Sequence, residues 1–137
     1  MHIQPYLQFN GRCEEAIEFY KAALGAKVQM LMRFKDSPEK HPEGAVTPDM
    51  AEKVMHSTLL IGDSVIHATD GGCTGGGTFS GISLSLTTDN DADAEKRFGA
   101  LAAGGKVNMP LTKTFFSSKF GMVIDKFGVS WMILVAR

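Results

Sequence analysis

Apolar residues along the chain recur at helix and strand spacings, and these spacings predict the same order of elements twice. Residues 5–9, PYLQF, have the pattern of a short strand, which Asn10-Gly11 ends. The next segment is typical of a helix, with two acidic residues in its first turn and Gly25 as its C-terminal stop. Its predicted buried face consists of Cys13, Ile17, Tyr20 and Leu24.

A strand that begins at residues 27–28 leads into a long polar segment. Residues 35–50 contain three prolines and six charged residues, which predicts a surface excursion rather than core. Two strands follow, VMHSTLLI (54–61) and SVIHAT (64–69), joined by a tight turn at Gly62-Asp63. The first half therefore contains a strand, a helix and three more strands.

The second half repeats this order at an offset of 79 residues. LGAKVQM (24–30) aligns with AGGKVNM (103–109), and Phe19 aligns with Phe98. The repeat comprises a strand at 82–86, a helix opened by acidic residues at 89–93, a strand at 106–109 and a strand pair that ends at 131–136. The predicted buried face of the second helix consists of Ala94, Phe98, Leu101 and Ala102.

Neither half can close a hydrophobic core alone, so we predict that both pack into one α+β domain over residues 1–137. Module one covers 1–70, a glycine hinge covers 71–77 and module two covers 78–137. A phosphate-binding glycine loop would lead into a helix, whereas GGCTGGG leads into the strand-like TFSGISLSL. The glycine run is therefore interpreted as a hinge and not as a nucleotide site.

Composition narrows the classes of partner. Hydrophobic residues make up 44% and charged residues 21%, and the formal net charge is -1. Such a balance gives no global field to attract nucleic acid or anionic lipid, and no apolar run is long enough to cross a bilayer. We expect a cytoplasmic protein with reduced thiols at Cys13 and Cys73 and without a nucleic-acid or membrane partner.

Three segments carry a resemblance to a known family: PYLQFNGRCEEAIEFYKAALGAK (5–27), VMHSTLLIGDSV (54–65) and TFFSSKFGMVIDKFGVSWMI (114–133). With these the chain resembles the PhnB-like group of the vicinal oxygen chelate superfamily, which includes glyoxalase, bleomycin-resistance and dioxygenase relatives. The resemblance implies paired βαβββ modules, a U-shaped mixed sheet around a pocket, and a homodimer. Many members bear the name 3-demethylubiquinone methyltransferase, but this sequence has no glycine-rich strand-to-helix motif suited to S-adenosylmethionine.

The resemblance also implies where a metal would bind in glyoxalase-like relatives. The four ligand positions fall on Pro5, His67, Gly81 and Met132. His67 alone could coordinate a divalent ion, whereas most catalytic metal sites use at least three protein ligands. We therefore predict no metal and no cofactor. Strand alternation predicts that Ile82, Leu84 and Leu86 lie under the helices and that Ser83 faces the pocket with Gly81, and it favours the pocket side for Met132.

Five residues are predicted to bind a ligand: His67, His56, Ser83, Phe116 and Met132. His67 and His56 are also the candidate catalytic bases, with Asp70 as a possible orienting carboxylate for His67, although each histidine could simply line the pocket. Alternation does not settle which way His56 points. The preferred function is metal-independent binding of a small molecule. The alternatives are a lyase or isomerase that uses His67 or His56 as base, and a metal-dependent glyoxalase or dioxygenase with ligands elsewhere.

Overall fold

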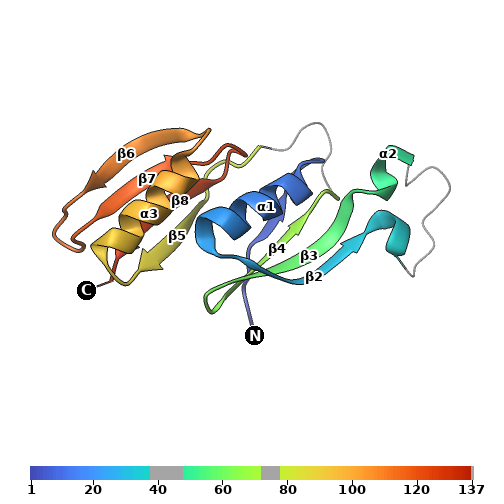
Figure 1. Cartoon of the computed structure of the whole chain (residues 1–137), viewed down its shortest axis with the longest axis horizontal. Coiled ribbons are helices and arrows are strands. Elements are labelled where there is room, and N and C mark those ends of the chain that lie inside the picture. Colours follow the sequence, from blue (N-terminus) through green and yellow to red (C-terminus); the bar gives the residue numbers. More distant parts are fainter. Residues whose placement is uncertain (38–47, 72–77, 137) are drawn as a thin grey trace. The chain divides into compact units, whose positions relative to one another are not determined.

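The computed structural model describes residues 1–37, 48–71 and 78–136, and the chain divides into two compact units, Met1–Gly77 and Thr78–Arg137. Each unit has a four-stranded sheet with a twelve-residue helix packed on one face, which confirms the predicted α+β class and the repeated βαβββ order (Figure 1). The predicted U-shaped arrangement of the two modules around a pocket stays a prediction.

The first unit contains a four-stranded sheet in the order β1-β4-β3-β2. Its elements are β1 (Tyr6–Gln8), α1 (Cys13–Leu24), β2 (Lys27–Arg33), the 3-10 turn η1 (Phe34–Asp36), α2 (Pro48–Ala51), β3 (Val54–Ile61) and β4 (Ser64–Thr69). Strands β1 and β4 are parallel, and the other neighbours are antiparallel. A part of the predicted surface excursion is thus helical, because proline at the first position of α2 is compatible with a helix start.

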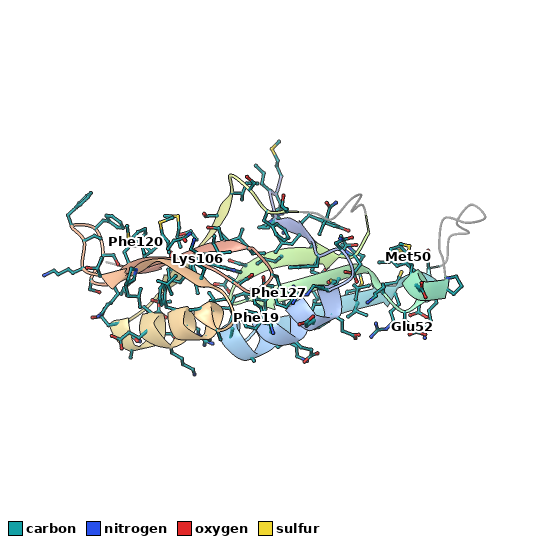
Figure 2. All side chains as sticks on the ribbon, turned by 90° about the horizontal axis from the view of Figure 1, so that it is seen from above. Phe19, Met50, Glu52, Lys106, Phe120 and Phe127 are labelled. Carbon is teal, nitrogen blue, oxygen red and sulfur yellow. The ribbon has the colours of Figure 1, made fainter. Side chains whose placement is uncertain are left out.

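The second unit repeats this topology in the order β5-β8-β7-β6. Its elements are β5 (Ser83–Thr88), α3 (Asp91–Ala102), β6 (Lys106–Thr112), β7 (Phe120–Ile124) and β8 (Ser130–Val135). Strands β5 and β8 are parallel, as β1 and β4 are. Figure 2 shows α1 and α3 each lying on one side of its own sheet. The face of each sheet turned away from its helix is called the far face below.

A buried carboxylate fixes the start of α1. Asp70, which directly follows β4, accepts hydrogen bonds from the backbone N–H groups of Gly11 (2.7 Å), Cys13 (2.9 Å) and Val54 (3.2 Å). Two of these donors lie at the N-terminus of the helix, where N–H groups lack partners within the helix. Gly25 ends the helix with a φ of 68°, as predicted. The predicted stripe of Cys13, Ile17, Tyr20 and Leu24 is buried throughout.

A second buried carboxylate fixes the hairpin before β8. Asp125 accepts hydrogen bonds from the backbone N–H groups of Phe127 (2.9 Å) and Val129 (3.1 Å) and from the indole N–H of Trp131 (2.9 Å). Gly128 supplies the positive φ, 91°, that the turn requires. This hairpin lies within the third segment of the family resemblance (114–133), and its single carboxylate satisfies three donors.

Helix α3 covers its sheet with a narrower buried stripe than the sequence predicts. Ala94 and Leu101 are fully buried, whereas Phe98 and Ala102 are half-buried. The Phe98 ring lies over Gly121 of β7, where an added Cβ would come within 2.7 Å of it. The absence of a side chain at residue 121 therefore allows the helix to approach the sheet closely.

Strand alternation within β5 and β8 agrees with the prediction, but the prediction for Ile82 is wrong: this residue precedes β5 and is 73% exposed. Leu84 and Leu86 lie partly buried toward the helix, whereas Ser83 is exposed on the far face. Met132 shares that face, since its register partner is Ser85. Within β8 the helix-facing side chains are almost fully buried; they are Trp131, Ile133 and Val135.

Some predictions concern segments that the structure does not describe. Residues 72–77, which make up most of the predicted hinge, lie outside the described residues, as does Cys73. Cys13 is fully buried, which agrees with its predicted place in the core. No helix among the described residues has the length and apolarity needed to cross a membrane.

Candidate functional site

Three strands bring a group of polar and aromatic side chains together on the far face of the first sheet. Tyr6 of β1 and Thr58 of β3 are the register partners of His67 on its two sides. His56 lies two residues before Thr58 and therefore points to the same face. The intervening residues Ser57 and Ala68 are fully buried toward the helix. The direction of His56, which the sequence leaves open, is thus the same as that of His67.

Hydrogen bonds connect these side chains into a chain that we call the Tyr6–Gln4 network. The Tyr6 hydroxyl lies 2.9 Å from His56 Nδ1, and His56 Nε2 lies 3.5 Å from Thr58 Oγ1. Thr58 Oγ1 lies 3.2 Å from His67 Nδ1, and His67 Nε2 lies 2.8 Å from Gln4 Oε1. All four ring nitrogens of the two histidines therefore have a partner within the network.

Ring contacts restrain the same side chains. The centroids of Tyr6 and His67 lie 5.7 Å apart at an interplanar angle of 26°, and those of His56 and His67 lie 5.3 Å apart at 24°. Tyr6 and His56 are 5.5 Å apart at 32°. Rings that face one another at these separations contribute packing in addition to their hydrogen bonds. The three rings thus hold one another in a defined orientation.

The side chains of the network differ in their exposure to solvent. Thr58 is 9% exposed, the two histidines are half-buried, and Tyr6 is 51% exposed. Burial, and secondarily the neighbouring His67, lowers the pKa of His56 below its ordinary value of 6.5. At neutral pH His56 is therefore a neutral imidazole, which has one donor and one acceptor nitrogen. Both ends of the network, Tyr6 and Gln4, are exposed to solvent.

A cleft of about 470 Å³ adjoins the network. Its lining consists of Tyr6, Gln8, Phe34, Met55, Thr69 and Gly71. Tyr6 belongs to both the cleft and the network. Gln8 lies two residues after Tyr6 on the same face of β1, and its register partner is Thr69. The cleft thus combines aromatic and thioether walls with a carboxamide, directly beside the Tyr6 end of the Tyr6–Gln4 network.

The other predicted ligand-binding residues lie in the second unit. Ser83 and Met132 share the far face of the second sheet, where the Ser83 hydroxyl is hydrogen-bonded to that of Ser130 at 2.8 Å. Phe116 is 41% exposed and packs edge-to-face on Phe120, with ring centroids 5.1 Å apart. The structure therefore groups His56 with His67 in one unit, and Ser83, Met132 and Phe116 in the other.

The residues of this face do not fit the metal site of glyoxalase-like relatives. Within residues 1–37, 48–71 and 78–136, no three side chains of His, Cys, Asp or Glu come together. The network has two imidazoles but no carboxylate or thiolate, and both imidazoles are already hydrogen-bonded through each nitrogen. Tyr6, rather than Pro5, stands opposite His67. A site with three or more protein ligands would require other donors.

Sequence reasoning assigned one orienting group incorrectly and missed three members of the network. The Asp70 carboxylate holds backbone N–H groups, whereas His67 is hydrogen-bonded to Thr58 and Gln4. Gln4, Tyr6 and Thr58 were not identified. A usable signal was present, because the polar residues Gln4, Tyr6 and Gln8 alternate with three apolar ones at the start of the chain.

Comparisons with known proteins agree with the topology. The chain matches the family model described as 3-demethylubiquinone-9 3-methyltransferase over residues 1–134. Protein YjdN of Escherichia coli (strain K12) is 37% identical over 100% of this chain and 97% of its own length. The crystal structure of protein PA1353 from Pseudomonas aeruginosa has a TM-score of 0.86 and 40% identity, and the match covers 99% of this chain and 98% of that one.

Two further structures connect the chain to a wider group. A PhnB protein from Bacillus cereus has a TM-score of 0.80 and 28% identity over 99% of this chain and 100% of that one. A glyoxylase/bleomycin resistance protein/dioxygenase domain from Frankia sp. EAN1pec shares the fold, with a TM-score of 0.66 and 16% identity over 100% and 98% of the chains. The chain therefore belongs to the 3-demethylubiquinone-9 3-methyltransferase family, a PhnB-like group with the glyoxalase/bleomycin resistance fold.

Proposed function

We propose that this protein binds a small molecule, without a metal, in the cleft on the far face of its first sheet. One observation carries the proposal: Tyr6 lines the cleft and is also an end member of the Tyr6–Gln4 network. Ligand sites are concave, are walled mostly by apolar groups and contain a few placed polar groups. The cleft and the network together have this composition, and about 470 Å³ suits a small metabolite.

Transfer of a methyl group, which the family's name describes, is not part of the proposal. The glycine-rich run at 71–77 is followed by β5, and not by the helix whose N-terminus would hold a nucleotide-like cofactor.

A second candidate function, general-base catalysis in a lyase or isomerase, is supported by the pair of Tyr6 and His56. A base needs an orienting partner and a pKa suited to its task. His56 has such partners in Tyr6 and Thr58, and its lowered pKa keeps it in the neutral, proton-accepting form. His67, the other candidate base, lies between Thr58 and Gln4 in the network.

We also propose that two copies of the chain associate, because the edge strands β2 and β6 expose apolar side chains at equivalent positions. Val28 and Met30 of β2 are 39% and 38% exposed, and Val107 and Met109 of β6 are 42% and 39% exposed. Apolar side chains that recur in this way suit a protein interface. Light scattering should give the mass of a dimer for the native chain and of a monomer for the Met30→Lys/Met109→Lys variant. A native monomer at high micromolar concentration would contradict the proposal.

Binding is tested by a thermal-shift screen of small polar and aromatic metabolites on protein treated with chelator. A compound that binds the folded state raises the melting temperature, and the stabilisation grows with the logarithm of its concentration once that concentration exceeds Kd. Stabilising compounds are then tested on Tyr6→Ala and on Ser85→Ala, the matched change on the second sheet. The proposal expects loss of the shift in Tyr6→Ala alone. Equal loss in both variants, or binding that requires added Ni²⁺, Zn²⁺ or Fe²⁺, would contradict it.

A further inference from the structure

We infer that the Tyr6–Gln4 network is polarised in one direction, and that it makes the Tyr6 oxygen an acceptor that selects ligands carrying an O–H or N–H donor. The ligand part of this inference rests on the proposed function, whereas the direction of the network does not. The direction follows from counting donors and acceptors along the five side chains.

The Gln4 carbonyl fixes the first step. A carboxamide oxygen can only accept a hydrogen bond, so the nitrogen 2.8 Å away, His67 Nε2, must carry a proton. In a neutral imidazole the other nitrogen is then an acceptor, and the Thr58 hydroxyl must donate its proton to His67 Nδ1 at 3.2 Å. The tautomer of His67 is thus set from outside the sheet, by a residue that precedes β1.

The remaining steps follow in the same sense. Thr58 has a single hydroxyl proton, which is committed to His67, so its oxygen accepts from His56 Nε2–H across 3.5 Å, the longest link of the network. His56 Nδ1 is then an acceptor, and Tyr6 donates its phenolic proton to it at 2.9 Å. The lowered pKa of His56 favours the neutral ring that this arrangement needs. Both histidines are consequently in the Nε2–H form.

Tyr6 is the end of the network that reaches the cleft. Its only proton is used by His56, so the lone pairs of its oxygen are what it offers to a molecule in the cleft. A ligand that places a donor there gains a hydrogen bond, whereas one that places an acceptor there meets another acceptor. With Phe34 also in the lining, the chemical class that fits is a planar phenol, an enol or an N–H heterocycle.

The direction is tested without any ligand by the ring nitrogens of the two histidines. Long-range ¹H–¹⁵N correlation spectra of the uniformly ¹⁵N-labelled chain at about pH 8 distinguish the two neutral tautomers, and the His56→Gln and His67→Gln variants assign the signals. We expect the Nε2–H tautomer at both residues. The Nδ1–H tautomer at either residue, or averaged shifts showing no preferred tautomer, would overturn the inference, because Tyr6 could then donate to a ligand.

The role of Gln4 has its own variant. Gln4→Leu removes the carbonyl that sets the direction and should shift His67 toward a mixture of tautomers, while backbone amide spectra show a retained fold. Gln8→Leu, the same change four residues further along the chain, is the matched control and should leave both tautomers unchanged. If the His67 tautomer is unaffected in Gln4→Leu, the proposed origin of the polarity is wrong.

Ligand selection is tested with phenol and anisole, which share a planar ring but differ in the donor. Amide chemical-shift titrations should give about fivefold to tenfold tighter binding of phenol, the range expected for one hydrogen bond, and Tyr6→Phe should remove the difference. Equal affinities in the native chain would overturn the selection rule. If neither probe shifts residues of the cleft, the ligand site itself is contradicted, and the histidine tautomers still decide the direction of the network.

Discussion

The two units have the same scaffold but differ in the chemistry of their far faces. Tyr6 stands opposite His67 in the first sheet, and Ser85, which lies 79 residues after Tyr6, stands opposite Met132 in the second. The other registers extend this correspondence across both sheets. The equivalent pairs are Tyr6 and Ser85, His67 and Met132, Thr58 and Met122, His56 and Phe120, and Met30 and Met109.

The residues that face the helices are those that the fold requires, whereas the residues on the far face of the first sheet are those of the candidate site. Toward the helices both sheets are buried and closely packed, as at the equivalent residues Ala68 and Ile133, which are 0% exposed. On the far faces the first unit carries a chain of five hydrogen-bonded side chains, whereas the second carries Met122, Met132 and Phe120 at the equivalent positions, with serine hydroxyls along β5. The helix-facing pattern can therefore repeat while the opposite side of each strand varies, since alternate side chains point to opposite faces. The first unit is thus the one suited to polar recognition.

The largest expected effects concern the two buried carboxylates, which stabilise different parts of the two units. Asp125→Ala leaves three donors without their acceptor, and Asp70→Ala does the same for two donors at the start of α1 and one at the start of β3. We expect each to lower the free energy of unfolding by about 3 kcal/mol. Urea unfolding measures this, with the exposed Asp89→Ala as control. A loss no larger than that of the control would show that these bonds are not important to either unit.

A smaller effect is expected where the packing of the units differs. Gly121 is the equivalent of Ser57, and Gly121→Ala places a Cβ 2.7 Å from the Phe98 ring. Overpacking of this kind should cost about 2 kcal/mol. Ser57→Ala removes one hydrogen bond to the Ala68 carbonyl and should cost about 1 kcal/mol. The two melting temperatures, compared with that of the native chain, test the order, and a stabilised Gly121→Ala would refute it.

A pH effect is expected for the first unit through His56. Its pKa is lower in the folded chain than the ordinary 6.5, so the unfolded chain binds more protons between these two values. The stability that His56 contributes is therefore present above about pH 6.5 and is lost as the pH falls. Besides Tyr6 and Thr58, the titratable group that faces it is His67. In His56→Gln the slope of unfolding free energy against pH in this range should decrease, and an unchanged slope would contradict the assignment.

The smallest effect is expected for the ion pairs that tie each helix to its sheet. Glu14 of α1 pairs with Arg33 of β2, and Glu95 of α3 pairs with Lys119 at 3.3 Å. The hydrogen bond from Arg33 lowers the pKa of Glu14, so its contribution is present above the unfolded pKa of about 4.5 and is lost as the pH falls below it. Both carboxylates are more than half exposed, so solvent screens the pairs. Double-mutant cycles should give less than about 1 kcal/mol for each, and a larger coupling would contradict this view.

Sequence periodicity predicted the scaffold well because helices and strands have local signals. The strands at 54–61 and 64–69 have the predicted bounds, and all four residues predicted for the buried stripe of α1 are buried, together with Ala16 and Ala23. The site was predicted only in part, as the two histidines. Tyr6 meets His67 through a parallel pairing across 61 residues, a contact that no local period encodes. Asp70 was misleading for a similar reason, since nearness in sequence to His67 did not place its carboxylate beside the imidazole.

The central claim is that the small molecule binds on the far face of the first sheet. An amide chemical-shift titration of the assigned, chelator-treated chain with phenol tests it most directly. We predict that the largest shifts fall on β1, β3 and β4 around Tyr6, His56 and His67, and that they disappear in Tyr6→Ala but not in Ser85→Ala. Largest shifts on β5, β7 and β8 around Ser83 and Met132, or shifts that appear only with an added divalent metal, would contradict it.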